Sequence, residues 1–204
     1  MRRELDYIYI EDGLGGNQDW LPEFDMNRGG CAAVTACDLC MYLAGLDKCE
    51  ELFKFKELSR ENFIKFASVM KPYLTPRYHG IDYLEIYLAG LGDYWRSVNY
   101  NKRRLEGLSG QADFKFALAA VKSQLDLNIP VPYLMLNHAD NKFDDFEWHW
   151  FMLAGYDELD DGDKIGNILV KAVTYGEFTW LNFNELWDTG YDRRGGLIKV
   201  LENF

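Results

Sequence analysis

Residues 31–45, CAAVTACDLCMYLAG, follow directly on Arg28-Gly29-Gly30 and dominate the architecture that the chain can adopt. Small and apolar side chains would cover most of the circumference of a helix built on this segment, which is the pattern of a buried helix. Gly45 is placed where a helix commonly stops. We therefore predict a central, buried helix over residues 31–45 that begins at Cys31.

The segments after this helix divide the chain into a helical half and a strand half. Apolar residues three or four positions apart predict further helices over residues 59–74, 80–95 and 109–127. From Pro130 onward the pattern changes to short aromatic and β-branched runs separated by turns, which predicts strands over residues 131–138, 147–156, 167–175, 177–183 and 195–202. Segregated helices and strands indicate an α+β fold, with a helical N-terminal half packed on an antiparallel β-sheet from the C-terminal half.

Two shorter segments complete this prediction. Residues 1–30 are rich in Gly, Asn and Asp, so we expect an irregular entry segment around one short strand at residues 6–10. Residues 182–187 are typical of a short capped helix.

Length and charge limit the classes of function. The 204 residues are 48% hydrophobic, which fits a single domain over residues 1–204. A formal net charge of -11 repels phosphate backbones and anionic lipid, so we expect neither nucleic acid nor membrane as a partner. The apolar stretch near the N-terminus is too short for a secretory signal, and no apolar run approaches the ~20 residues needed to cross a bilayer. We expect a cytoplasmic protein, and its oligomeric state stays open.

The four cysteines, Cys31, Cys37, Cys40 and Cys49, lie close together in the sequence. A disulfide scaffold would spread its cysteines along the chain, so free thiols are expected. Cys37 and Cys40 have CxxC spacing, but no second CxxC or nearby histidine completes a zinc set. The acidic run at residues 157–166 is more typical of a solvated hairpin loop than of a calcium site. No metal and no cofactor is therefore expected.

Cys31 is the first candidate for chemistry. A helix N-terminus beside an imidazole stabilises a thiolate and so lowers the pKa of a thiol. Gly29 and Gly30 permit a tight turn and leave room for substrate, while Ala32 and Ala33 keep the first turn slim enough for an N–H to face an oxyanion. The alternative is that Cys31 is a small buried residue at the start of a helix.

His149 is the second candidate, because it lies among apolar residues of a predicted strand, where an imidazole without a partner is costly. The alternative is an ordinary histidine bonded to a carbonyl. His138 and His79 are more typical of turns. Trp148, Trp150, Trp180 and Trp187 could line a groove, but aromatic residues in strands are more often core, and we expect core.

These residues together resemble a known family. Asn17-Gln18 ahead of Gly29-Gly30-Cys31-Ala32-Ala33, and His149 heading a strand that closes in Gly155-Tyr156, resemble papain-like cysteine peptidases, in particular the bacterial double-glycine leader-peptidase-like group. The resemblance spans residues 15–190 and implies a papain-like fold. It implies Gln18 as oxyanion donor, Cys31 as nucleophile and His149 as general base.

The residue that orients the histidine departs from the family. Where such enzymes have Asn or Asp, this chain reads Val173-Thr174-Tyr175-Gly176. Thr174, Asn182 and Glu177 are the alternatives, and we predict Thr174 because it lies at the same strand end. A hydroxyl accepts more weakly than a carboxylate, so we expect a less populated thiolate–imidazolium pair and modest activity.

The resemblance implies a thiol hydrolase that cleaves peptide amide bonds through an acyl-enzyme intermediate on a peptide or acyl substrate. Two alternatives remain open. One is an acyltransferase on the same scaffold, and the other is a catalytically retired domain that binds peptides.

Overall fold

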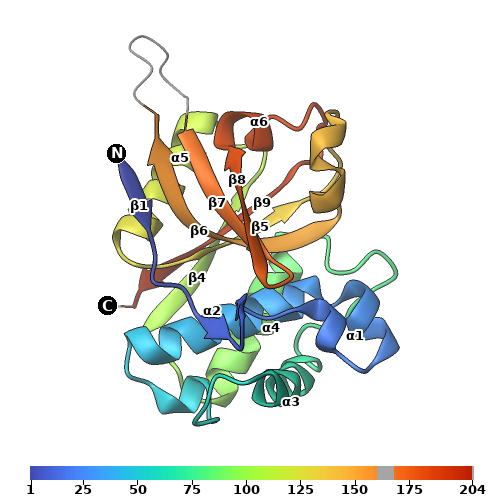
Figure 1. Ribbon diagram of the computed structural model, residues 1–204, viewed down its shortest axis with the longest axis vertical. Coiled ribbons are helices and arrows are strands. Elements are labelled where there is room, and N and C mark those ends of the chain that lie inside the picture. Colours follow the sequence, from blue (N-terminus) through green and yellow to red (C-terminus); the bar gives the residue numbers. More distant parts are fainter. Residues whose placement is uncertain (160–167, 204) are drawn as a thin grey trace.

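The computed structural model describes residues 1–159 and 168–203, and it has helices on both faces of one large sheet (Figure 1). The helices are α1 (Phe24–Gly29), α2 (Cys31–Leu46), α3 (Arg60–Met70), α4 (Leu84–Ser97), α5 (Phe114–Asp126) and α6 (Phe183–Trp187). Three short 3-10 helices are η1 (Gln18–Trp20), η2 (Glu50–Leu52) and η3 (Asn141–Phe146). The α+β class is therefore confirmed.

Seven strands form the main sheet, in the order β4-β9-β5-β6-β7-β8 with β1 paired to the far end of β6. They are β1 (Arg2–Glu4), β4 (Arg103–Ser109), β5 (Val131–Met135), β6 (His149–Glu158), β7 (Ile168–Thr174), β8 (Glu177–Asn182) and β9 (Gly195–Glu202). All of these pairings are antiparallel. A separate small hairpin joins β2 (Tyr9–Ile10) to β3 (Gly13–Leu14).

Strand β6 divides the hydrophobic core in two, because successive side chains of a strand point to opposite faces. Trp150 and Met152 pack into the cluster that also holds α2, α3 and α4. Phe151 and Leu153 pack into the cluster that holds α5 and α6. Figure 1 shows these two groups of helices on opposite sides of the sheet. Burial on both faces explains why β6 reads as a continuous apolar run.

Helix α2 is the central element of the first cluster. Ala33, Ala36 and Cys37 are fully buried, and such small side chains let neighbouring elements approach the helix closely. The Asp47 cap at its C-terminal end forms an ion pair with Arg103 of β4 at 2.6 Å. Helix α2 is thus held between the sheet and the other helices, and its N-terminus is directed towards the functional site described below.

Several predicted boundaries need correction. Strand β4 lies in the half predicted to be helical. It is an edge strand with a charged sequence and no continuous apolar run, and α4 covers it on one side. Helix α1 lies in the segment predicted to be irregular, and of the strand predicted at residues 6–10 only Tyr9–Ile10 is paired. The short capped helix is confirmed as α6, with Asn182 as its N-cap.

Further predictions concern the acidic run, membrane-spanning segments and the number of domains. Most of the acidic run at residues 157–166 lies outside the described residues. Within the described ranges, no helix is long and apolar enough to cross a membrane. That residues 1–204 form a single domain stays a prediction.

Candidate thiol site

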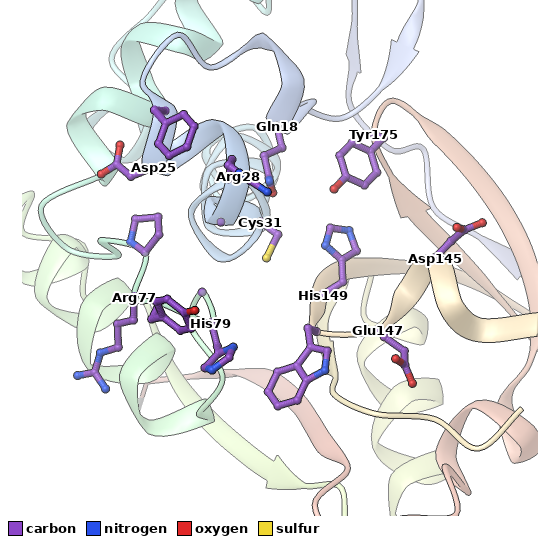
Figure 2. Close-up of a pocket in the computed structure, with 16 residues that line it drawn as sticks. Gln18, Asp25, Arg28, Cys31, Arg77, His79, Asp145, Glu147, His149 and Tyr175 are labelled. Carbon is purple, nitrogen blue, oxygen red and sulfur yellow. The ribbon is translucent and has the colours of Figure 1, made fainter. Parts of the chain in front are cut away.

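A pocket of about 800 Å³ opens where the N-terminus of α2 meets the start of β6 and the end of β7. Cys31, His149 and Gln18 all line it. Figure 2 shows the Cys31 sulfur and the His149 imidazole on facing sides of this pocket, with the Gln18 side chain above the thiol. The three residues that the sequence singled out thus meet in one place, from three separate elements.

The geometry around Cys31 depends on a sharp junction between α1 and α2. The N–H of Gly30 donates to the Met26 carbonyl at 2.9 Å, and Gly30 is then the N-cap of α2. A Cβ at position 30 would lie far inside van der Waals contact with that same carbonyl oxygen. Glycine at position 30 is therefore required for Cys31 to begin a new helix immediately after α1.

The electrostatics of the Cys31 thiol differ from the expectation. Burial is the largest effect and raises the pKa of Cys31 above its ordinary value. The backbone N–H groups of Trp150, Ala32 and Cys31 itself oppose that effect, but they do not reverse it. The prediction that this helix start lowers the thiol pKa is wrong, because removal from water outweighs the helix-end field.

His149 is the first residue of β6 and is held on two sides. Its Nε2 is hydrogen-bonded to Thr174 Oγ1 at 2.7 Å, and its ring stacks on Tyr175 at 5.2 Å between centroids. Burial lowers the pKa of His149 to about 4. The ring is therefore neutral at pH 7. The contact predicted between His149 and Thr174 is present, and the role of Thr174 as orienting residue stays a prediction.

The resting state of the pair follows from these two shifts. Burial favours the uncharged form of both groups, so a neutral thiol faces a neutral imidazole at pH 7. Nε2 of His149 is hydrogen-bonded to Thr174, so Nδ1 is the ring nitrogen that can serve as a proton acceptor. Such a site can act by general-base activation of the thiol rather than through a preformed ion pair.

Gln18 lies in η1 and is buried beside Cys31. Its Nε2 donates to the Asn27 carbonyl at 2.8 Å, which leaves a second N–H on the same nitrogen. Its Oε1 is buried and has no hydrogen-bond partner among the described residues. The preceding Asn17 donates from Nδ2 to the Tyr175 carbonyl at 3.0 Å. The loop that carries Gln18 is thus attached to the turn beside His149.

The other candidates for orienting residue have different contacts. Asn182 accepts from the N–H groups of Asn184 and Glu185 as the cap of α6, and Glu177 pairs with Thr174 across the turn into β8. Val173 is buried in the core. The hydrogen bond to Nε2 of His149 comes from Thr174.

The rival histidines occupy two different environments. The ring of His138 is hydrogen-bonded to the Glu185 carbonyl and accepts from the Asp140 N–H, so it has a local structural role. His79 lies on an exposed loop and lines the pocket opposite His149, where its ring packs against Trp148 at 5.6 Å (Figure 2). The turn assignment of both residues is confirmed, but the sequence did not indicate that His79 reaches the site.

The tryptophans separate into core and surface. Trp150 and Trp187 are buried, as predicted. Trp148 is 38% exposed and lines the pocket, so the prediction of a core position is wrong for this residue. Trp148 directly precedes β6 and has a positive φ of 51°, so its backbone departs from the extended conformation of that strand. Trp180 is half-buried on the edge strand β8.

Asp38 is a buried polar residue near the site that sequence reasoning left aside. It lies on α2, is 3% exposed, and accepts hydrogen bonds from Tyr7 and from the N–H of Gly16. A single acidic residue inside an otherwise apolar helix was the available signal, because a buried carboxyl group needs partners.

The four cysteines are free thiols, as predicted. Cys37 and Cys40 are buried inside α2, where Cys40 accepts a hydrogen bond from Trp95 at 3.5 Å. Within the described residues, no cluster of three or more His, Cys, Asp or Glu side chains is arranged to hold a metal ion.

Comparison with known proteins found no matching family, no similar curated protein and no similar solved structure.

Proposed function

We propose that this chain is a papain-like thiol enzyme that cleaves peptide amide bonds through an acyl-enzyme intermediate, with Cys31 as nucleophile and His149 as general base. The observation that carries the proposal is the meeting of a thiol at the start of a buried helix with a strand-borne imidazole whose far nitrogen is bonded to Thr174. The packing of that helix on an antiparallel sheet is compatible with a papain-like fold. A cytoplasmic location remains part of the proposal.

The proposed reaction begins from the neutral pair. As the Cys31 sulfur attacks the carbonyl carbon, Nδ1 of His149 accepts the thiol proton. Nε2–H of His149 donates to the Thr174 hydroxyl, which holds the ring in the required tautomer. The oxyanion of the tetrahedral intermediate accepts from Nε2 of Gln18 and from an N–H at the start of α2.

The intermediate then collapses with cleavage of the carbon–nitrogen bond. The imidazolium of His149 donates its proton to the leaving amine, and a thioester on Cys31 remains. Water, deprotonated by the same imidazole, attacks that thioester; the carbon–sulfur bond breaks, the imidazolium returns its proton to the Cys31 sulfur, and the acid is released. An amine in place of water would give an acyltransferase, so adding a nucleophilic amine and measuring amide product separates these two activities.

The direct test is labelling by a peptidyl vinyl sulfone, an electrophile that traps nucleophilic thiols. We expect one adduct per chain, on Cys31, lost in Cys31→Ala and strongly reduced in His149→Ala. His79→Ala is the matched control, because it removes an imidazole from the other side of the same pocket. Equal labelling of Cys31→Ala and the wild type, or loss of labelling in His79→Ala alone, would overturn the proposed assignment.

A second candidate function is a peptide-binding domain without catalysis. It is favoured by the neutral resting pair and by the exposed aromatic side chains around the pocket, which are Phe24, Tyr78, Trp148 and Tyr175. Such a domain would bind peptides equally well in the wild type and in Cys31→Ala, and it would form no acyl adduct. Equilibrium binding combined with mass spectrometry of the intact protein therefore distinguishes the two functions.

A further inference from the structure

The loop that leads to Gln18 is attached to the nucleophile helix by one buried carboxyl group. Asp38 Oδ1 accepts from the N–H of Gly16 at 2.8 Å, two residues before Gln18. Asp38 lies seven residues after Cys31, two helical turns away and on the same face of α2. Cys31, Asp38, Gly16 and Gln18 all line one small internal cavity next to the main pocket.

We propose that Asp38 is a positioning residue for the thiol site: by holding Gly16 it sets the place of the Gln18 side chain relative to Cys31. This inference rests on the proposed function, because it assigns Asp38 a role in oxyanion stabilisation by Gln18. Asp38 itself touches no reacting atom.

The cost of burying Asp38 supports a specific role. Burial raises the pKa of Asp38 to about 7, so the position is unfavourable for a carboxylate. The ionisable groups that face it are Tyr7, Cys37 and Tyr87, and none of them is a cation. An apolar side chain would fill the same space of α2 without this cost, but it would leave the Gly16 N–H without an acceptor.

The loop has little freedom to move once this bond forms. A Cβ at Gly15, which has a φ of +69°, would overlap the Asp38 carboxyl group, and a Cβ at Gly16 would overlap the Phe63 ring. The two glycines therefore allow the loop to approach α2 and α3 very closely. Close contact with Asp38 and Phe63 therefore explains why residues 15 and 16 are both glycine.

The same loop is also attached on its other side. Asn17 donates to the carbonyl of Tyr175, the residue whose ring stacks on His149. Residues 16–18 therefore connect the nucleophile helix to the turn beside the general base. Without the Asp38 bond the loop keeps the bond of Asn17 to Tyr175 and the bond of Gln18 to Asn27, but it loses its attachment to α2, so the position of Gln18 relative to the thiol is less fixed.

The test compares two reactions of Cys31 that differ in one requirement. Acylation by p-nitrophenyl acetate passes through an oxyanion, whereas alkylation by iodoacetamide does not. We expect Gln18→Ala to slow acylation about 10²-fold and to leave alkylation within about twofold. Asp38→Leu, which removes the acceptor, should slow acylation about tenfold or more with the same sparing of alkylation.

Three variants separate positioning from general loss of structure. Asp38→Asn keeps an oxygen acceptor for Gly16 and should restore most of the acylation rate. Cys40→Ala also removes a buried group from α2 but does not touch the loop, so acylation and alkylation should change together. If Asp38→Leu does not fold, Asp38→Ser replaces it. The serine hydroxyl lies one bond nearer the backbone than the Asp38 carboxyl oxygens and can hydrogen-bond within α2, so Gly16 still loses its acceptor.

The double variant Gln18→Ala/Asp38→Leu gives the decisive comparison. If Asp38 acts through Gln18, the double variant acylates no more slowly than Gln18→Ala alone. The inference would be overturned if the slowing factors of Gln18→Ala and Asp38→Leu multiplied in the double variant. It would also be overturned if Asp38→Leu slowed alkylation as much as acylation. Failure of the proposed function gives a different result: the wild-type protein would then be acylated no faster than the Cys31→Ala variant.

Discussion

At the scale of single residues, the site is governed by desolvation. Cys31 is at a helix N-terminus and near an imidazole, two features that lower the pKa of a thiol, yet burial raises the pKa of Cys31 and lowers that of His149 to about 4. Both shifts favour the uncharged pair. The Thr174 hydroxyl is hydrogen-bonded to the ring but adds no negative charge, so it does not stabilise an imidazolium as a carboxylate would.

The first prediction concerns the pH dependence of Cys31 alkylation. In His149→Ala, where no imidazole accepts the thiol proton, the rate with iodoacetamide should increase about tenfold per pH unit from pH 6 to pH 8, because the pKa of Cys31 is raised. Cys31 should be labelled before the other cysteines, because burial raises the pKa of Cys37 well above its ordinary value and that of Cys40 to about 12. A rate that is constant across this range in His149→Ala would mean a preformed thiolate, contrary to the prediction.

The second prediction concerns Thr174. Thr174→Val keeps the shape of the side chain but removes the bond to His149, so acylation of Cys31 should slow about 2- to 10-fold, equivalent to about 0.5–1.5 kcal/mol. Thr174→Ser keeps a hydroxyl and should retain most of the rate. Thr174→Asn tests whether an amide oxygen accepts the hydrogen bond from His149 equally well. An unchanged rate in Thr174→Val, with loss of activity in His149→Ala, would show that another group orients the ring.

At the scale of secondary-structure elements, the junction of α1 and α2 sets the position of Cys31. Gly30 ends one helix and caps the next, and it packs against the Met26 carbonyl with no room for a Cβ. Gly45, near the other end of α2, has no atom close to its missing side chain. The two glycines of the same helix therefore have different roles.

The third prediction uses this pair. Gly30→Ala must displace the Met26 carbonyl, so it should lower the free energy of unfolding by about 1–3 kcal/mol and slow acylation of Cys31. Gly45→Ala is the matched control and should be neutral or stabilising by up to about 1 kcal/mol, with unchanged acylation. Urea unfolding and ester acylation of both variants are the measurements. Equal effects of the two substitutions would contradict the role given to Gly30.

At the scale of the whole molecule, one sheet separates two hydrophobic clusters, and the thiol site lies at an end of that sheet. Two titratable groups near the site, Asp38 and His149, are buried, and burial raises the pKa of Asp38 and lowers the pKa of His149, so both shifts disfavour the charged form. Each therefore links the stability of the fold to pH.

The fourth prediction follows from the signs of these two shifts. The pKa of Asp38 is raised, so its contribution to stability is lost as pH rises from about 4 through 7. The pKa of His149 is lowered, so its contribution is lost as pH falls from about 6.5 through 4. Asp38→Asn should accordingly gain stability relative to the wild type between pH 5 and pH 8, measured by urea unfolding. A constant difference between the two proteins would show that Asp38 does not titrate in this range.

The sequence by itself predicted the division into helices and strands and brought forward the candidate residues Cys31, His149 and Thr174. Local periodicity predicted α2 and β6, because the 3.6- and 2-residue repeats are properties of neighbouring residues. The start of α2 at Cys31 and the contact of His149 with Thr174 followed from residues close to the ends of those elements.

Only the tertiary structure decided the electrostatics and the walls of the pocket. The direction of the Cys31 pKa shift depends on which distant segments exclude water from the thiol, and no local pattern records that. Trp148 is exposed at the pocket although it lies next to a buried strand, and His79 reaches the pocket from a loop distant from His149 in sequence. The bond from Gly16 to Asp38 likewise joins residues that only the folded chain brings together.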